Sequence, residues 1–194
     1  IRDSELAHRT VTGHFQANWD SLVKFIETEK FTITQRRDST IIDKKLTRLY
    51  GVDTTKEIVI IDTLGFVPVK DSLFGDDPRY KTMMKVPGVQ SDKYDKWVSS
   101  LPSSTKKQQD YKSLMENSKI FQLKAGLLEQ NGINIPVFEA FVSKEVLLFD
   151  QDKNFVELES EVKSVEGVNG PTLKVGSMDE INTNGNWPKN YSKQ

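Results

Sequence analysis

The sequence contains no cysteine among its 194 residues. This absence excludes disulfide bonds, thiol nucleophiles and zinc sites with thiolate ligands. It does not decide the cellular compartment, because a chain without disulfides can fold in the cytosol or in the periplasm. Histidine is also scarce. His8 and His14 lie six residues apart, whereas two metal ligands on one helix face need a spacing of three or four.

A strong net charge is absent as well. Lys and Arg total 27 and Asp and Glu total 28, for a formal charge of −1. Proteins that bind nucleic acids usually carry a net positive field or a basic stripe, so we expect no nucleic-acid partner.

No apolar run approaches the roughly 20 residues that cross a membrane. The chain opens with the polar IRDSELAHR. We therefore expect a targeting segment or an anchor before Ile1 and any membrane association to run through it.

The common catalytic and cofactor motifs are missing too. The sequence has no G-x-x-x-x-G-K, G-x-G-x-x-G, G-x-S-x-G or H-E-x-x-H. Phosphate cradles, dinucleotide sites, serine elbows and zinc proteases are therefore unsupported. What the chain does have is 36% hydrophobic and 9% aromatic residues, enough to build a core. We predict a folded domain without a cofactor, and the balance of evidence is against an enzyme.

The N-terminal segment is predicted to form one long amphipathic helix over residues 4–28. Its apolar residues recur at spacings of three and four, which puts them on one helix face. They are Val11, Phe15, Trp19, Leu22 and Ile26.

Two interpretations of this helix face remain open. The face packs against its own domain, or Phe15, Trp19 and Leu22 form an interaction surface for a partner or a second copy. We assign residues 1–30 to this helix, with an interpretation as a stalk, and residues 31–194 to a single α+β domain.

The rest of the chain mixes strand and helix patterns. EIVIID, at residues 57–62, is a continuous apolar run that predicts a buried strand. Residues 91–100 and 104–117 have helical spacing and predict a central helical pair. Asn131–Gly132 separates two apolar segments and predicts a hairpin, with a second hairpin turning at residues 150–154. The predicted fold is α+β, ending in an antiparallel β-meander.

One segment matches the ligand spacing of a calcium loop. Asp150, Asp152, Asn154 and Glu161 occupy its positions one, three, five and twelve, so their oxygens are candidate ligands for Ca²⁺. Position six, where the loop needs glycine, is Phe155, and no helix pattern precedes the segment. The alternative interpretation is a polar β-turn.

Four aspartates follow the apolar EIVIID run: Asp62, Asp71, Asp76 and Asp77. Paired carboxylates divide acid and base roles or hold a divalent metal. They support an alternative function, a carboxylate-based, metal-dependent hydrolase centred on Asp62 and Asp76. Aspartate also forms turns, which explains Asp76-Asp77-Pro78 without catalysis.

Trp187 near the C-terminus has two interpretations, an exposed recognition anchor or a side chain that pins the tail on the domain.

Taken together, the patterns favour a non-enzymatic binding or assembly domain, with a protein partner or self-association. We expect the extracytoplasmic part of a bacterial envelope protein, in the periplasm or cell envelope, with the cytoplasm as the alternative.

Overall fold

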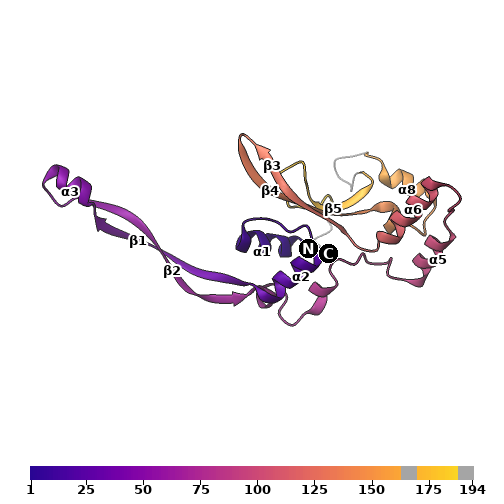
Figure 1. Ribbon diagram of the computed structural model, residues 1–194, viewed down its shortest axis with the longest axis horizontal. Helices are drawn as coiled ribbons and strands as arrows, with labels where there is room; N and C mark the ends of the chain where they lie inside the picture. Colours follow the sequence, from indigo (N-terminus) through magenta and orange to yellow (C-terminus); the bar gives the residue numbers. More distant parts are fainter. Residues whose placement is uncertain (163–169, 188–194) are drawn as a thin grey trace.

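The computed structural model describes residues 1–162 and 170–187, which form a mixed helix and strand fold (Figure 1). This confirms the predicted α+β class. Strands β1 and β2 form one antiparallel sheet, and β3, β4 and β5 form a second. In chain order the elements are α1 (Arg2–Thr12), α2 (Trp19–Thr28), β1 (Lys30–Ile42), α3 (Lys44–Tyr50), β2 (Thr55–Pro68), α4 (Val69–Leu73), the 3₁₀ helix η1 (Pro78–Lys81), α5 (Asp92–Ser100), α6 (Lys106–Asn117), β3 (Gln122–Gln130), β4 (Ile133–Ser143), α7 (Lys144–Leu147), α8 (Lys153–Ser160) and β5 (Thr172–Gly176).

The N-terminal segment forms two helices, so the prediction of one helix over residues 4–28 was wrong. Helix α1 ends at Gly13, whose φ of 85° lies in the left-handed region that favours glycine. Helix α2 begins after Asn18, whose side chain accepts a hydrogen bond from the backbone N–H of Ser21 at 2.9 Å. Gly13 is thus a helix end rather than a weak point inside a helix.

The arm, residues 30–68, projects from the remainder of the described chain, which we call the body (Figure 1). The body holds three clusters of buried apolar residues. One joins α5, α6, β4 and α7 and contains Val86, Val89, Tyr94, Val98, Met115, Val142 and Val146. Another joins α1, α2, α4 and η1 and contains Ala7, Leu22, Phe25, Ile26, Val69 and Tyr80. The third contains Phe15, Phe138, Ala140 and Val175. Because α1 and α2 belong to these cores, they do not project from the body as a stalk.

The C-terminal sheet forms largely as predicted. Asn131 and Gly132 have φ angles of 54° and 75°, as a two-residue hairpin turn requires, and they join β3 to β4. Strand β5 pairs with the other side of β4. The predicted second hairpin was wrong, because residues 153–160 form α8. Asp152 starts this helix by accepting a hydrogen bond from the backbone N–H of Asn154 at 2.9 Å.

The predicted central helical pair is confirmed as α5 and α6. Thr105 begins α6 with a capping box, in which its hydroxyl accepts from the backbone N–H of Gln108 and the Gln108 side chain accepts from the backbone of Thr105. The pair packs against β4 and α7 at the end of the body opposite the arm (Figure 1).

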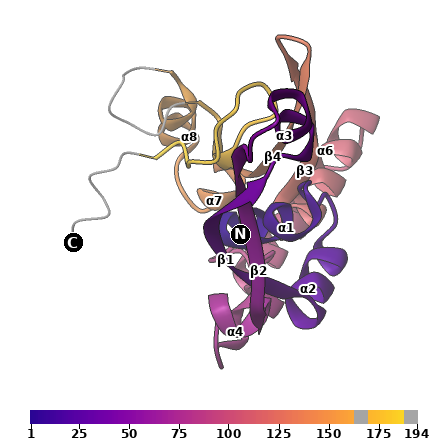
Figure 2. The same cartoon turned by 90° about the vertical axis from the view of Figure 1, so that its left-hand side faces the viewer.

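The arm is a long two-stranded ribbon with a helix at its tip. Strands β1 and β2 pair along their whole lengths, from Lys30–Pro68 at the base to Ile42–Thr55 at the tip. Strands of 13 and 14 residues span about 45 Å. At the base, the arm contacts α2 and α4, and the backbone N–H of Val69 donates to the Glu29 carbonyl at 2.9 Å (Figure 2).

Candidate functional site

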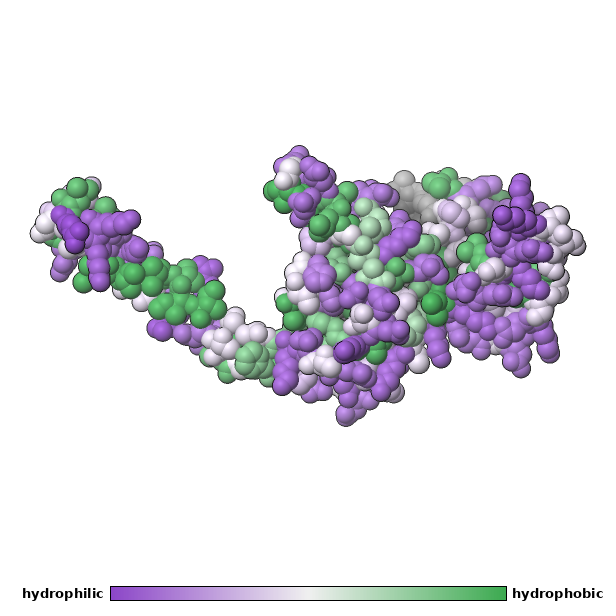
Figure 3. Space-filling model, in the orientation of Figure 1, coloured by the Kyte–Doolittle hydropathy of each residue, from purple (hydrophilic) through white to green (hydrophobic). Residues whose placement is uncertain are grey.

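The arm carries most of the exposed apolar side chains in the described chain. None of its residues is buried, so the prediction of a buried strand at residues 57–62 was wrong. Twelve of the 22 large apolar side chains that are exposed in the described residues lie on the arm, and Figure 3 shows them along its length and at its tip. They are Ile33, Ile41, Ile42, Leu46, Leu49, Tyr50, Val52, Val59, Ile61, Leu64, Phe66 and Val67.

The total surface agrees with this picture. The chain exposes 13662 Å², whereas a compact monomer of its 22.1 kDa exposes about 9,300 Å². The arm contributes to the excess because none of its residues is buried. A shape of this kind leaves apolar surface in water that folding alone does not remove.

Both faces of β2 are apolar. Val59 and Ile61 lie on one face of the ribbon, and Ile58 and Ile60 lie on the other, because successive side chains alternate across a strand. An antiparallel strand with one wet face usually alternates apolar and polar residues. Four apolar residues in a row are typical of a strand that is covered on both sides. In this chain, Val59 and Ile61 are exposed and Ile58 and Ile60 are half-buried, so no residue of β2 is buried on either side.

The two edges of the arm differ in charge. Each strand has one neighbour, so the outer edge of each leaves backbone N–H and C=O groups unpaired within the sheet. The middle of β1 carries Arg36, Arg37 and Asp38, and charges of this kind oppose pairing with another chain. The middle of β2, residues 58–61, carries no charge. The edge of β2 is therefore the one that suits strand addition.

Helix α3 at the tip is amphipathic. The Asp43 side chain accepts from the backbone N–H groups of Lys45 and Leu46, and Gly51 ends the helix with a φ of 70°. Leu46, Leu49 and Tyr50 follow the i, i+3, i+4 spacing that gathers side chains on one helix face. Leu49 is 72% exposed. The tip thus presents an apolar face that packs against nothing in the body.

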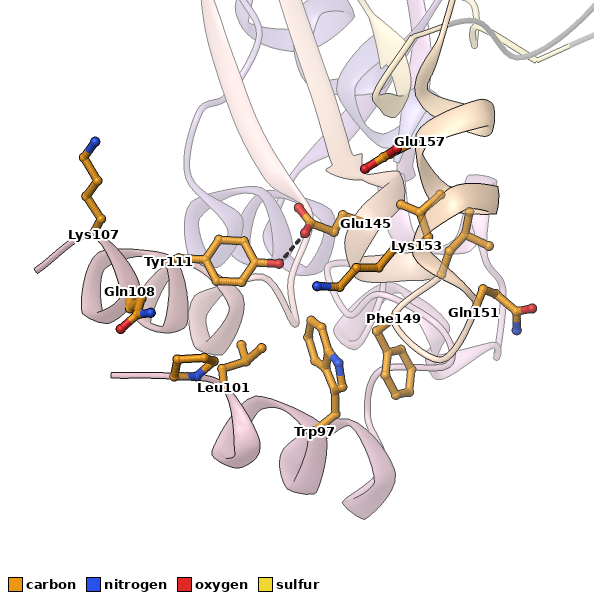
Figure 4. Close-up of a pocket in the computed structure, with 13 residues that line it drawn as sticks. Trp97, Leu101, Lys107, Gln108, Tyr111, Glu145, Phe149, Gln151, Lys153 and Glu157 are labelled. Carbon is orange, nitrogen blue, oxygen red and sulfur yellow. Dashed lines mark hydrogen bonds between the residues drawn. The ribbon is translucent and has the colours of Figure 1, made fainter. Parts of the chain in front are cut away.

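A groove of about 580 Å³ opens at the far end of the body between α5, α6, α7 and α8 (Figure 4). Its lining combines apolar and polar side chains: Trp97, Leu101, Pro102, Lys107, Gln108, Tyr111, Glu145, Leu148, Phe149, Gln151, Lys153, Val156 and Glu157. This size and this mixture are usual for pockets that take small ligands.

One hydrogen bond links α6 to α7 across the groove. The Tyr111 hydroxyl donates a hydrogen bond to Glu145, as Figure 4 shows. Burial raises the pKa of Tyr111, and the hydrogen bond to Glu145 raises it further. A tyrosine with a raised pKa stays neutral at pH 7 and is therefore no general base. The described residues contain no group of three or more His, Asp or Glu side chains that could hold a metal ion.

The predicted calcium loop does not form. Asp152 caps the start of α8, whereas Glu161 caps its end, so the helix separates the two side chains. Asp150 instead pairs with Lys93 at 2.8 Å, which lowers its pKa. Asn154 lies in the first turn of α8. The four oxygen groups do not converge, and the spacing match is explained by a capped helix.

Three of the four predicted interaction residues contribute to the body itself. Phe15 and Leu22 are buried, and Phe15 packs against Phe138 with ring centroids 4.7 Å apart. Trp19 is half-buried, and its indole N–H donates to the carbonyl of Phe121 at 2.9 Å. Phe15 lies between α1 and α2, whereas Trp19 and Leu22 lie on α2, so the predicted single helix face does not form. All three side chains pack in clusters of the protein's own core or donate to it, so they are not free for a partner.

Trp187 is partly exposed and contacts its own domain, while its role as a recognition anchor stays a prediction. It is 46% exposed, and it lines a second groove with Phe121, Ala140 and Leu173. Its ring lies so close to Gly185 that a Cβ there would approach it to 2.1 Å. The side chain folds back over this glycine and keeps an exposed edge.

The four aspartates of the hydrolase hypothesis do not gather. Asp62 lies on the arm and pairs with Arg37 at 2.6 Å. Asp77 caps η1 and pairs with Arg79 at 2.6 Å. Asp71 and Asp76 are exposed. The described residues therefore contain no carboxylate cluster to support that reaction, and turn and cap formation explains these residues.

Sequence reasoning did not find the arm. The apolar run over residues 58–61 was recognised, but its burial was assumed from its composition. A signal for the arm was present in the two strand patterns of nearly equal length that enclose the Asp43 to Gly51 helix. That arrangement is typical of one long hairpin closed by a helical tip.

Comparisons with known proteins give no relative to guide the assignment, because no protein-family model, curated protein or solved structure matches the chain. Within the described residues, no helix has the length and apolar content needed to cross a membrane. The candidate site is therefore defined by geometry alone, and the arm is its main feature.

Proposed function

We propose that this chain is a non-enzymatic binding or assembly domain that engages a protein partner through its arm. The observation that carries the proposal is β2, a strand that is apolar on both faces and has no buried residue on either. The body, with its three buried clusters, is the base from which the arm reaches about 45 Å.

The energetics support a partner. A two-stranded hairpin is at best marginally stable in water, because it has too little apolar contact to offset the entropy of ordering. Covering the exposed parts of Val59, Ile61, Leu64 and Phe66 would contribute roughly 1 kcal/mol each before association costs are subtracted. An arm of this composition gains most of its stability only when another surface covers it.

The proposal extends to location. We place the domain in the periplasm or cell envelope, where a reaching arm would join components that are separated in space.

The alternative function, a carboxylate-based hydrolase, has no cluster of acids to support it in the described chain. The groove at α5–α8 has a suitable size for a ligand, but nothing about it indicates a reaction.

In-cell photo-cross-linking tests the proposal. A photoreactive residue replaces Ile61 on the arm in the full-length gene product, and Leu127 on β3 of the body serves as the matched control. The two side chains are 67% and 64% exposed, so accessibility does not separate them. We expect a protein adduct at position 61 and none at position 127. Absence of any protein adduct at position 61 and at Val59 would refute the proposal.

A further inference from the structure

We propose that the arm's partner is a second copy of this chain, joined edge to edge along β2 in an antiparallel, two-fold symmetric pair. The inference rests on the proposed function and adds the identity of the partner. It starts from the unpaired outer edge of β2, whose neighbour on the other side is β1 alone. A second β2 supplies the same N–H and C=O groups in the complementary order.

Charge selects the register of this pair. If Val59 of one copy lies opposite Val59 of the other, then Lys56 lies opposite Asp62 twice, once at each end. The residues between them are apolar or pair an apolar residue with Glu57. The neighbouring registers that keep the outward N–H and C=O groups of the two strands in phase centre on Ile58 or Ile60. They set Lys56 opposite Ile60 or Leu64, so neither brings Lys56 opposite Asp62.

The same register matches the two ends of the arms. An antiparallel pair sets the tip of one arm beside the base of the other. Val52 precedes β2 at the tip, and Phe66 lies near the base of the strand. Both side chains are 65% exposed in the single chain. Each arm therefore offers an apolar tip and an apolar base, and the two-fold pair brings these together twice.

The pairing is also closed. A two-fold contact uses the same surface on both copies and leaves no second β2 edge for further growth. The remaining edges are those of β1, where Arg36, Arg37 and Asp38 oppose addition of another strand. The expected product is a dimer with a four-stranded ribbon in the order β1–β2–β2–β1, and not a fibre.

Single cysteines in the purified full chain test the register directly, because the protein has no cysteine of its own. Val59→Cys places two thiols opposite each other at a Cα separation of about 5 Å, which suits a disulfide. Ile61→Cys lies on the same face, but its two copies are offset by four residues, or about 13 Å. We expect Val59→Cys to form a disulfide-linked dimer at least about tenfold faster than Ile61→Cys under mild oxidation.

Two further tests control for random collision and check the register. Asp38→Cys on the outer β1 strand reports random collision and should form no disulfide-linked dimer. Glu57→Cys mixed with Ile61→Cys should form the mixed disulfide, because these positions face each other in the proposed register. Sedimentation of the unmodified chain should show a monomer–dimer equilibrium, and replacing residues 31–67 by Asn-Gly should abolish it.

The outcomes separate the two proposals. If Val59→Cys links no faster than Ile61→Cys and the chain sediments as a monomer at every concentration, the second copy is excluded. The proposed function still stands in that case if the in-cell adduct at position 61 contains a different protein. Binding of the monomer to anionic vesicles through Leu49 and Tyr50, without dimerisation, would also overturn the second-copy inference and replace the protein partner with a membrane.

Discussion

Strand β2 is the longer strand of the arm and β4 is the longest strand of the body's sheet, and they differ in burial. Strand β4 lies between β3 and β5 and buries Val137, Phe138, Ala140 and Val142. Strand β2 has one neighbour and buries nothing. Their local composition is similar, so the difference lies in what covers them. The body covers β4, whereas the cover for β2 must come from another molecule if the run at residues 58–61 is to leave water.

The largest expected difference between the two regions comes from removing an aromatic ring. Phe138→Ala leaves a cavity in the body and should lower the free energy of unfolding by about 3–5 kcal/mol. Phe66→Ala on the arm removes a ring that is already mostly in water, so we expect less than about 0.5 kcal/mol. Urea denaturation at a concentration where the chain is monomeric measures both. Equal losses would mean that the arm is packed in the single chain.

A buried carboxyl group gives the next effect. Glu5 is buried, one of its oxygens accepts from the backbone N–H of Gln16 at 2.9 Å, and the other has no hydrogen-bond partner among the described residues. Burial raises its pKa from about 4.5 to about 7. The folded state therefore holds this proton more tightly than the unfolded state does.

The sign of the pH effect follows from linkage. The contribution of protonated Glu5 is fully present below about pH 4.5 and is lost as the pH rises through 7, by up to about 3 kcal/mol. Glu5→Gln should remove this loss, so its stability should fall less than the wild-type value between pH 4.5 and 8. Glu57→Gln on the arm is the control and should leave the pH profile unchanged. Parallel profiles for wild type and Glu5→Gln would contradict the assignment.

Removing a tyrosine hydroxyl should give a smaller difference in unfolding free energy between the body and the arm. The buried Tyr94 hydroxyl donates to the carbonyl of Met115 at 2.8 Å. Tyr94→Phe removes this bond, although the carbonyl keeps the backbone N–H of Ser118 at 3.0 Å, and should cost about 1 kcal/mol in thermal or urea unfolding. Tyr50→Phe at the exposed tip should change the stability by less than about 0.5 kcal/mol. A loss at Tyr50 as large as that at Tyr94 would show that the tip is held against the body.

The smallest contrast lies in the ion pairs. Lys174 and Glu139 pair at 2.9 Å on the partly covered sheet of the body, and Arg37 and Asp62 pair at 2.6 Å on the open arm. Exposed pairs contribute about 0–1 kcal/mol and are screened by salt. We expect Glu139→Gln to destabilise more than Asp62→Asn. The order should persist in 0.5 M salt, and its reversal would mean that the arm pair is shielded from solvent.

The sequence was most informative where local chemistry decides the structure. Asn131–Gly132 predicted its hairpin because few residues tolerate positive φ at both positions. The central helical pair followed from apolar spacing. The prediction of a second hairpin at residues 150–154 was wrong for a physical reason. Asp152 suits a turn and a helix cap equally well, and here it caps α8. Local patterns could not choose between them.

Burial was the property that local patterns could not supply. The run at residues 58–61 is apolar in the way that a core strand is, and nothing within it states which surface covers it. Among the predicted site residues, Phe15 and Leu22 are buried in the core, because an apolar pattern suits contact with the chain's own domain as well as contact with a partner. The candidate site depended on tertiary arrangement and could not be predicted from spacing.

Hydrogen–deuterium exchange at two protein concentrations tests the central claim most directly, because it reports whether β2 is covered. In the dilute monomer we expect the amides of residues 58–61 to be protected less than about tenfold, while residues 137–142 of β4 approach the protection of global unfolding. In concentrated solution, protection of residues 58–61 should rise at least about 100-fold, with β4 unchanged. Strong protection of residues 58–61 in the dilute monomer, independent of concentration, would contradict the account.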